Sequence, residues 1–464
     1  MKKNANPEKT EGVKILLGDP KKAIIKLSLP MIVAMSVQTI YNVVDAIWVS
    51  GLGADALSAV GFFFPFFFMI MALAAGIGVG GGSAVSRRIG ARDKEGADRV
   101  AAHTLVIMVV VAVVLMVPLF VFAEPIFSGM GAGRVTGMAT VYARIMALGT
   151  IIIFFSNIAN ALLRSEGAAT RAMYALMTGA GLNIVLDPIF IYVLGLGVAG
   201  AAVATVISLA VSSLILFNWI FIKKDTYISV TFHNFRIQKE VIKEILKVGL
   251  PSAVSQLSMS FSVLFLNFIV VSAGGTDGVA VFTTGWRVAT FASLPLIGIA
   301  TGVVTVTGAA YGSNAYEKLE TAFMYAVRVG LLIEIVIALS TYAVAPQITL
   351  LFTLSEDAAR ITEDLITFLR IMCIYYPMVS FGMLSSAMFQ GTGKGINALI
   401  VTIFRTIVLA APLAYVFSSP AQMGLTGVWW GIVLGNITGA SSAFVWARIY
   451  IKGLKEKKER NLYS

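Results

Sequence analysis

Residues 27–49, LSLPMIVAMSVQTIYNVVDAIWV, form an apolar stretch that is long enough to cross a bilayer as one helix. The stretch nevertheless contains an acid, Asp45, and Tyr41 lies four residues before it. Side chains four residues apart share a helix face, so these two would lie next to one another. An aspartate at the centre of a membrane helix costs about 2.5–3.5 kcal/mol on insertion scales, which indicates that the charge is used.

A second apolar stretch repeats this pattern. It covers residues 172–194, AMYALMTGAGLNIVLDPIFIYVL, and contains Asp187 with Asn183 four residues earlier. Two membrane acids, each with a polar neighbour on its own face, predict a site for a cation or a proton. The alternative is a structural pair of hydrogen-bonded acids, in which Asp187 caps a kink at Pro188.

The composition excludes a soluble protein. Of 464 residues, 58% are hydrophobic and 13% are charged, whereas soluble domains are about 45–50% apolar and about 25% charged. The single cysteine, Cys373, excludes disulfides and thiolate metal sites. The net charge of +11 is better explained by lysines and arginines in cytoplasmic loops than by binding of nucleic acid.

The chemistry-bearing residues do not form an enzyme motif. The two histidines, His103 and His233, are far apart and have no metal-ligand spacing. The chain contains no HExxH motif and no nucleophile paired with a base. We therefore predict that the protein is not an enzyme and needs no cofactor beyond a coupling ion, H+ or Na+.

Apolar segments of about 20 residues or more recur along the chain and predict twelve membrane helices in two sets of six. The segments lie near 25–49, 57–85, 99–122, 137–161, 172–194, 199–222, 246–272, 279–309, 320–344, 361–388, 396–418 and 424–450. We expect an N-terminal lobe over residues 1–222, a cytoplasmic linker over 223–244 and a C-terminal lobe over 245–464. The charged tail of the C-terminal lobe, KGLKEKKER, is expected to fray.

Lysine and arginine are concentrated in alternate connections between these segments. They are frequent before the first helix, in 87–99, in the linker and in the C-terminal tail. The connections that contain neither residue are 50–56, 195–198, 273–278, 345–358 and 419–423, and only Arg134 breaks the alternation. The positive-inside rule then predicts a multi-pass protein of the plasma membrane with both termini in the cytoplasm.

The two halves of the chain resemble one another at a separation of 222 residues. This separation pairs Gly90 with Gly312 and Asp45 with Asn267. Six predicted helices separate the copies, so both copies start on the same side and the repeat is parallel. Two related lobes about an axis along the membrane normal are a layout found in transporters. The paired acids belong to the first lobe only.

These features resemble the multidrug and toxic compound extrusion (MATE) transporters over essentially the whole chain. The local matches are LPMIVAMSVQTIYNVVDAIWVSGLG in the first helix, NIVLDPIFIY in the fifth and GLGVAGAAVATVIS at the start of the sixth. The first-helix acid and the N-x-x-x-D pair are similar to the archaeal and DinF-like branch. The resemblance implies an all-α polytopic membrane protein with twelve transmembrane helices in two pseudo-symmetric six-helix bundles, the MATE-type fold of the MOP superfamily. It also implies alternating-access export of organic cations and amphipathic drugs, coupled to H+ or Na+.

By motif position, the resemblance assigns ion or proton coupling to Asp45 and Asp187, surrounded by Tyr41, Asn183 and Thr205. At 1.5 Å per residue both acids lie about 25 Å from the cytoplasmic edge, in the outer half of the first lobe. Two acids in one dry pocket cannot both ionise cheaply, which favours a shared proton. The all-oxygen set of Asp45, Asn183, Asp187 and Thr205 is equally suited to Na+.

The resemblance also implies roles for four other residues of the first lobe. Gln38, Asn157 and Asn160 would line its substrate cavity, although buried amides can also simply join helices. Pro30 would be a conformational hinge. The alternative for Pro30 is a proline in the first helical turn, where it costs little.

Glu334 is a third acid within an apolar segment, VGLLIEIVIALS. We expect it to form a structural ion pair with one of the second-lobe arginines, and a second coupling site is the alternative. The arginines in or near helices of that lobe are Arg287, Arg328, Arg370 and Arg405.

The partners expected are cationic or amphipathic small molecules and the lipid bilayer, with the protein a monomer. An alternative function is a flippase for lipid-linked precursors in the same superfamily. The acids of the first lobe disfavour it, whereas the second-lobe arginines keep it open. A channel is disfavoured, because two pseudo-symmetric lobes do not suggest a ring of subunits.

Overall fold

The computed structural model describes residues 10–223, 225–233, 235–353 and 359–463, so the first nine residues of the predicted N-terminal lobe lie outside it. Twelve stretches of the described residues are long and apolar enough to span a membrane. The first six are α2 (Pro20–Ser50), α3 (Ala54–Gly90), α4 (Lys94–Val121), η2 with α6 (Gly133–Val135, Thr136–Ser165), α7 with η3 (Ala169–Pro188, Ile189–Val193) and α8 with η4 (Gly197–Phe217, Asn218–Lys223). The predicted all-α fold of twelve helices is confirmed.

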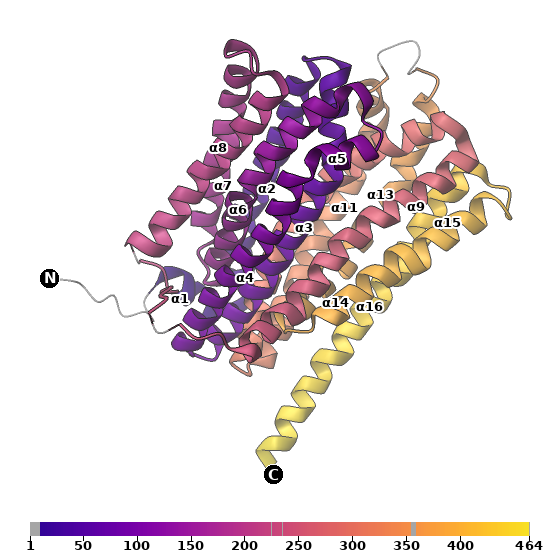
Figure 1. The fold of residues 1–464 in the computed structure, drawn as a ribbon. Helices are drawn as coiled ribbons and strands as arrows, with labels where there is room; N and C mark the ends of the chain where they lie inside the picture. The colour runs from indigo at the N-terminus through magenta and orange to yellow at the C-terminus, as the bar shows by residue number, and fades with distance from the viewer. Residues whose placement is uncertain (1–9, 224, 234, 354–358, 464) are drawn as a thin grey trace.

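The last six spans are built from α9 (Lys239–Ala292), α10 (Leu294–Gly312), α11 (Tyr316–Leu350), α13 (Thr362–Gly391), α14 with η5 and α15 (Gly395–Ile403, Phe404–Ala410, Ala411–Ser418) and α16 (Gly424–Tyr463). The two sets of six lie side by side as two bundles (Figure 1). Two short helices, α1 (Glu11–Leu17) and α5 (Ala123–Gly129), lie at opposite ends of the molecule, called here the α1 end and the α5 end.

The first membrane helix begins earlier than its apolar segment. Asp19 caps α2 by accepting a hydrogen bond from the backbone N–H of Lys21 at 2.8 Å, and Pro20 occupies the first helical position. Pro30 therefore lies in the interior of α2, and the alternative that placed it in the first helical turn is wrong. Its ring and missing N–H weaken the helix at a membrane-embedded position.

The charged C-terminal tail continues α16 and does not fray. Lys455 pairs with Glu317 at 3.2 Å and with Glu320, both on α11. Lys458 Nζ donates a hydrogen bond to the carbonyl oxygen of Asn314 at 2.9 Å. These contacts with the start of α11 explain why the tail stays helical although it is polar on all sides.

The predicted repeat appears as a reciprocal contact between the two bundles. A Cβ added to Gly90 would lie 1.9 Å from the carbonyl oxygen of Ala309, and one added to Gly312 would lie 1.9 Å from that of Arg87. Gly312 follows Gly90 by 222 residues, and Ala309 follows Arg87 by the same number. The two contacts are therefore equivalent, as a pseudo-two-fold axis between the bundles requires.

The glycine-rich run of α3 lets neighbouring helices approach closely. A Cβ on Gly76 would lie 2.6 Å from the carbonyl oxygen of Gly249 in α9. A Cβ on Gly81 would lie 2.5 Å from the side chain of Thr104 in α4. Larger residues at these positions would force the helices apart.

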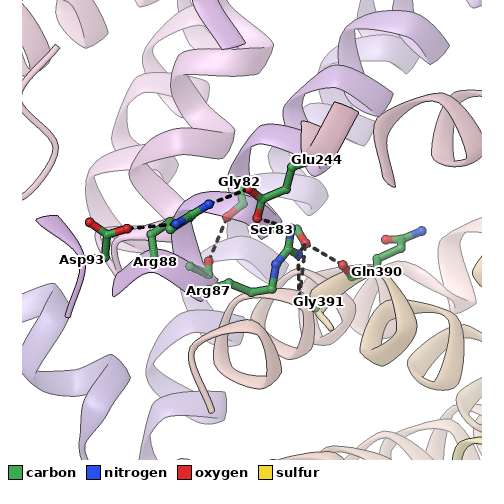
Figure 2. A network of polar contacts seen from close by, with 9 residues as sticks. Gly82, Ser83, Arg87, Arg88, Asp93, Glu244, Gln390 and Gly391 are labelled. Carbon is green, nitrogen blue, oxygen red and sulfur yellow. Dashed lines mark hydrogen bonds and ion pairs between the residues drawn. The ribbon is translucent and has the colours of Figure 1, made fainter. Parts of the chain in front are cut away.

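At the α1 end a polar network joins the bundles (Figure 2). Ser83 Oγ of α3 donates to the carbonyl oxygen of Gln390 in α13 at 2.5 Å. Arg87 donates to the carbonyl oxygen of Gly391 and to Glu244 of α9, both at 3.2 Å. Because Arg87 and Glu244 are largely buried, this pair is screened less than a surface ion pair. The network holds the bundles together at this end.

The segment between η4 and α9 runs along the α1 end and is fastened to the first bundle. Its backbone N–H groups donate to side chains that α4 and the turn after α6 present. These pairs are Ile228 to Glu166 (3.0 Å), Ser229 to Asp98 (2.8 Å) and Gln238 to His103 (2.9 Å). His103 therefore supports the linker and is not a candidate metal ligand.

Glu166 makes the fastening of the linker sensitive to pH. It is 3% exposed, in the turn between α6 and α7. Burial raises the pKa of its carboxyl from 4.5 to about 7, and the Ile228 N–H and the charge of Arg171 act against this rise. A raised pKa means that the folded chain favours the neutral carboxyl. Its contribution to stability is therefore complete below pH 4.5 and is lost as the pH rises through about 7.

We expect Glu166→Gln to abolish this pH dependence, because the amide oxygen still accepts from Ile228 but carries no charge. Hydrogen-exchange protection of the Ile228 amide, corrected for intrinsic exchange, should fall by up to about tenfold per pH unit between pH 4.5 and about 7 in the unmodified protein, and should level off above about 7. It should stay level in the variant. Glu11→Gln, at an exposed glutamate of α1, is the control and should behave as the unmodified chain. Equal pH dependence with and without Glu166 would contradict this role.

Candidate functional site

The structure brings together the five residues predicted to act on an ion. Tyr41 and Asp45 lie in the last three turns of α2, toward the α5 end. Asn183 and Asp187 lie in the last turns of α7, and Thr205 lies in the third turn of α8. These helices meet because α2 packs against α7 and α7 packs against α8.

Asp45 and Asp187 face one another across the α2–α7 contact. Their carboxyl groups lie within hydrogen-bonding reach. Asp187 is fully buried and Asp45 is half-buried. Among the described residues no hydrogen-bond donor satisfies either oxygen of Asp187. Two ionised carboxylates this close repel, so the pair needs a shared proton or a bound cation.

Asn183 and Thr205 add further oxygen atoms to the pair. The Asn183 amide nitrogen donates to Thr205 Oγ1 at 3.4 Å, which leaves its buried Oδ1 atom without a donor. Tyr41 lies within hydrogen-bonding reach of Thr205 and close to both acids. Carboxylate, amide and hydroxyl oxygens suit a hard cation such as Na+ and are poor ligands for a transition metal.

The end of α7, where Asp187 lies, departs from a regular α-helix. Pro188 lacks an N–H, and the next five residues, Ile189–Val193, form a wider π-helical turn. Tyr192 Oη in that turn donates to the carbonyl oxygen of Trp48 in α2 at 2.5 Å, which ties the two helix ends together. Asp187 does not cap the kink, since neither of its oxygens has a donor.

Tyr142 of α6 belongs to the same site and was not predicted. It lies close enough to Asp45 and Asp187 for their charges to act on it, and its ring packs edge-on against Phe63 at 5.3 Å. A single tyrosine in the segment TVYARIM gives no sequence signal for a site in another helix. Only a tertiary contact could have revealed it.

The three amides predicted to line the substrate cavity have different surroundings. Asn160 donates to the carbonyl oxygen of Ala172 in α7 at 2.9 Å and accepts from Arg164. Asn157 donates to a carbonyl of its own helix at 2.9 Å, and Gln38 is half-buried in α2. None of the three lines the cavity between the bundles. Their role toward substrate stays a prediction, and the contacts of Asn160 favour helix joining.

A cavity of about 350 Å³ lies between the bundles, next to the polar network of the α1 end. Arg164 reaches it from the first bundle and Arg405 from the second, and its described lining contains no aspartate or glutamate. Arg405 is 6% exposed, and its Nε and Nη1 atoms have no hydrogen-bond partner. Other lining residues are Ser252, Gln256, Met259, Thr301, Met383 and Gln390.

Glu334 of α11 does not form the ion pair predicted for it. No lysine or arginine of the described residues lies within ion-pair distance of its carboxylate. Arg370, one of the candidates, instead lies over the ring of Tyr342 at 5.3 Å. The prediction was wrong because the positions of residues in the sequence do not show which faces of two helices contact one another.

Comparison with known proteins gives a consistent result. The profile of the MatE family matches residues 30–189 and 251–416, once in each bundle. The multidrug export protein MepA of Staphylococcus aureus (strain MSSA476) is 27% identical over 426 residues, which cover 91% of this chain and 92% of MepA.

Solved structures match more closely. One is described as a MOP superfamily transporter from Pyrococcus furiosus in which reverse polarity of the binding pocket suggests a different function. It is 51% identical, with a TM-score of 0.93 over 96% of this chain and 99% of that one. Another, described as MATE in the bent conformation, is 49% identical, with a TM-score of 0.91 over 97% and 99% of the two chains.

Proposed function

The chain belongs to the MatE family of multidrug efflux transporters, and from this premise we propose that it exports organic cations and amphipathic drugs in exchange for H+ or Na+. Members of the family are membrane transporters of small molecules; they are not enzymes and need no cofactor. The observation that carries the proposal is the Asp45–Asp187 pair, in which Asp187 is fully buried and neither of its oxygens has a donor among the described residues.

The pair couples an ion to a substrate through competition for one negative charge. Without a cation, two carboxylates at hydrogen-bonding distance repel, so the empty pair is unstable. A proton, a Na+ ion or a cationic drug each relieves this repulsion, and only one of them can do so at a time. An ion that binds more tightly in one conformation biases the transporter toward it by that difference in affinity.

Tyr41, Asn183 and Thr205 complete the coupling site. In a Na+ site the unpaired Asn183 Oδ1 and the Thr205 hydroxyl would join the carboxylates of Asp45 and Asp187 as ligands. In a proton site they would orient the acid that carries the proton. Both ions stay possible within this proposal.

Alternating access requires a part that bends, and we assign this role to Pro30. It interrupts the hydrogen bonds of α2 four turns before Asp45, so an event at the acid pair can act on the kink along one helix. A related structure is described as being in a bent conformation, which supports a fold that can bend. The moving parts would be the lobes 1–222 and 245–464, joined by the linker 223–244, in a monomer.

Transport measurements on the two acids test this proposal. In proteoliposomes, Asp45→Asn and Asp187→Asn should each slow efflux of a cationic dye by about 5- to 150-fold and remove its dependence on the H+ or Na+ gradient, the range of a coupling energy of about 1–3 kcal/mol. Asp55→Asn is the control, since Asp55 is an exposed partner of Arg134.

Separate measurements test the coupling ion, the hinge and the aspartate pair. Gradients of H+ alone and of Na+ alone show which ion couples. Pro30→Ala should slow efflux while the residual transport still follows the ion gradient. Unchanged efflux and unchanged gradient dependence in both aspartate variants would refute coupling through the pair.

We further propose that the α1 end and both chain termini face the cytoplasm, because lysines and arginines are concentrated at that end. Cys373 is the only cysteine and is buried, so an added cysteine can be labelled alone. On intact cells a membrane-impermeant thiol reagent should label Ser128→Cys, on α5, and spare Ser313→Cys, in the turn after α10. The opposite labelling would invert the orientation.

A second candidate is a flippase for an anionic amphiphile such as a lipid-linked precursor. Arg405, whose Nε and Nη1 atoms have no partner, and Arg164 in the cavity between the bundles favour it, since they would repel a cation and hold a phosphate. The Pyrococcus furiosus relative, described as having a binding pocket of reverse polarity, points in the same direction.

The two candidates differ in what Arg405→Gln does. If the cargo is anionic, the variant should lose about tenfold or more of its affinity for dodecyl phosphate, which corresponds to about 1.4 kcal/mol. Binding of a cationic dye would then be unchanged or tighter. Arg370→Gln, at an exposed arginine of the same bundle, is the control. Weak binding of dodecyl phosphate to the unmodified chain would exclude this candidate.

A further inference from the structure

The second bundle contains a buried acid that the proposed coupling site does not use. Glu334 lies in the middle of α11 and is 0% exposed. Neither of its carboxylate oxygens has a hydrogen-bond partner among the described residues. Buried polar groups without a partner are rare in folded proteins, and such a group requires an explanation.

The packing of α11 shows which residues surround Glu334. Gly330 lies one turn before it on the same helix face. A Cβ on Gly330 would lie 2.7 Å from the side chain of Leu296 in α10 and 3.6 Å from that of Ser380 in α13. This face of α11 is therefore packed against α10 and α13, away from lipid.

The packing of α13 against α11 places Tyr376 near Glu334. Because α11 and α13 are consecutive spans, they run in opposite directions. One turn forward from Gly330 to Glu334 therefore corresponds to one turn back from Ser380 to Tyr376. Glu334 also lies close enough to Tyr376 for its charge to act on it. Tyr376 is 0% exposed, and its hydroxyl oxygen has no partner either.

Arg405 does not neutralise Glu334 through an ion pair. Arg405 and Glu334 both lie near Tyr375. They form no ion pair, and Arg405 lines the cavity between the bundles instead. An ionised carboxylate at this depth without a partner would cost several kcal/mol.

The site is not a copy of the aspartate pair. At the separation of 222 residues, Glu334 corresponds to Ala112 of α4, which is fully buried. Asp45 corresponds to Asn267, which carries no charge. The second bundle thus places its acid on a different helix and beside a different partner.

We propose that Glu334 and Tyr376 form a binding site for one small monovalent cation, H+ or Na+, in the second bundle and separate from the Asp45–Asp187 pair. The cation neutralises the Glu334 carboxylate, and the Tyr376 hydroxyl either donates to that carboxyl group or contributes its oxygen to Na+. The site is a property of binding and does not depend on coupling through the aspartate pair.

Infrared difference spectroscopy of the purified full-length protein tests this site without an ion gradient. The spectrum of Glu334→Gln is subtracted from that of the unmodified protein, once in Na+ and once in choline. A bound proton gives the carbonyl band of one protonated acid, the same in both media. Bound Na+ gives carboxylate bands that shift when Na+ replaces choline, and a thermal stabilisation by Na+ that Glu334→Gln loses.

Two further variants make the result specific. Tyr376→Phe keeps the volume of the side chain and should shift the Glu334 band, because one hydrogen bond or ligand is lost. Glu317→Gln, at an exposed glutamate of the same helix, should remove only an ionised carboxylate signal that ignores Na+. If Glu334 also gave an ionised carboxylate signal that does not respond to Na+, the proposal would be overturned. The charge of Glu334 would then be balanced at a distance by Arg405. A Glu334 band unchanged by Tyr376→Phe would remove Tyr376 from the site.

Discussion

A charge inside a bilayer must be paired, neutralised by an ion, or brought to water, and this constraint orders the charged residues of the chain. Toward the α1 end the charges are paired with one another, as in Arg87 with Glu244 and Lys94 with Asp98. Deeper in the bundles Asp187 and Glu334 have no positive partner among the described residues. Of these pairs, Arg87 with Glu244 joins the two bundles, whereas we propose that the unpaired charges are neutralised by a ligand from outside the chain.

The scaffold is repeated but its charges are not. The contact of Gly90 with Ala309 recurs as the contact of Gly312 with Arg87, which shows that the backbones follow one plan. The position that corresponds to Asp45 is Asn267, an amide that cannot take up a proton near neutral pH. A symmetric contact can let both bundles move in an equivalent way, while an ion that binds one of them biases that movement in one direction only.

The number of helices and the repeat followed from the sequence, because hydrocarbon forces each apolar segment to satisfy its backbone within a helix. The grouping of Asp45 with Asp187 was expected from the i, i+4 pattern and the family resemblance, whereas their role in coupling stays a prediction. The helix ends did not: Asp19 extends α2 and Lys455 extends α16 through side-chain contacts that periodicity does not contain. Nor could the sequence show that Glu334 forms no ion pair with an arginine, since that depends on the rotation of α11 about its own axis in the bundle.

The two kinds of unpaired charge also constrain what the transporter can carry. The arginines lie around the cavity near the α1 end, and the aspartates lie toward the α5 end. On the proposed function and orientation, a cation in the cavity is repelled from the cytoplasmic side and attracted toward the aspartates. It can leave only when an ion takes its place on the carboxylates, since their repulsion returns when they are empty. The field of the arginines and the exchange at the aspartates would therefore favour the same direction of transport, outward for a cation and inward for the ion that replaces it.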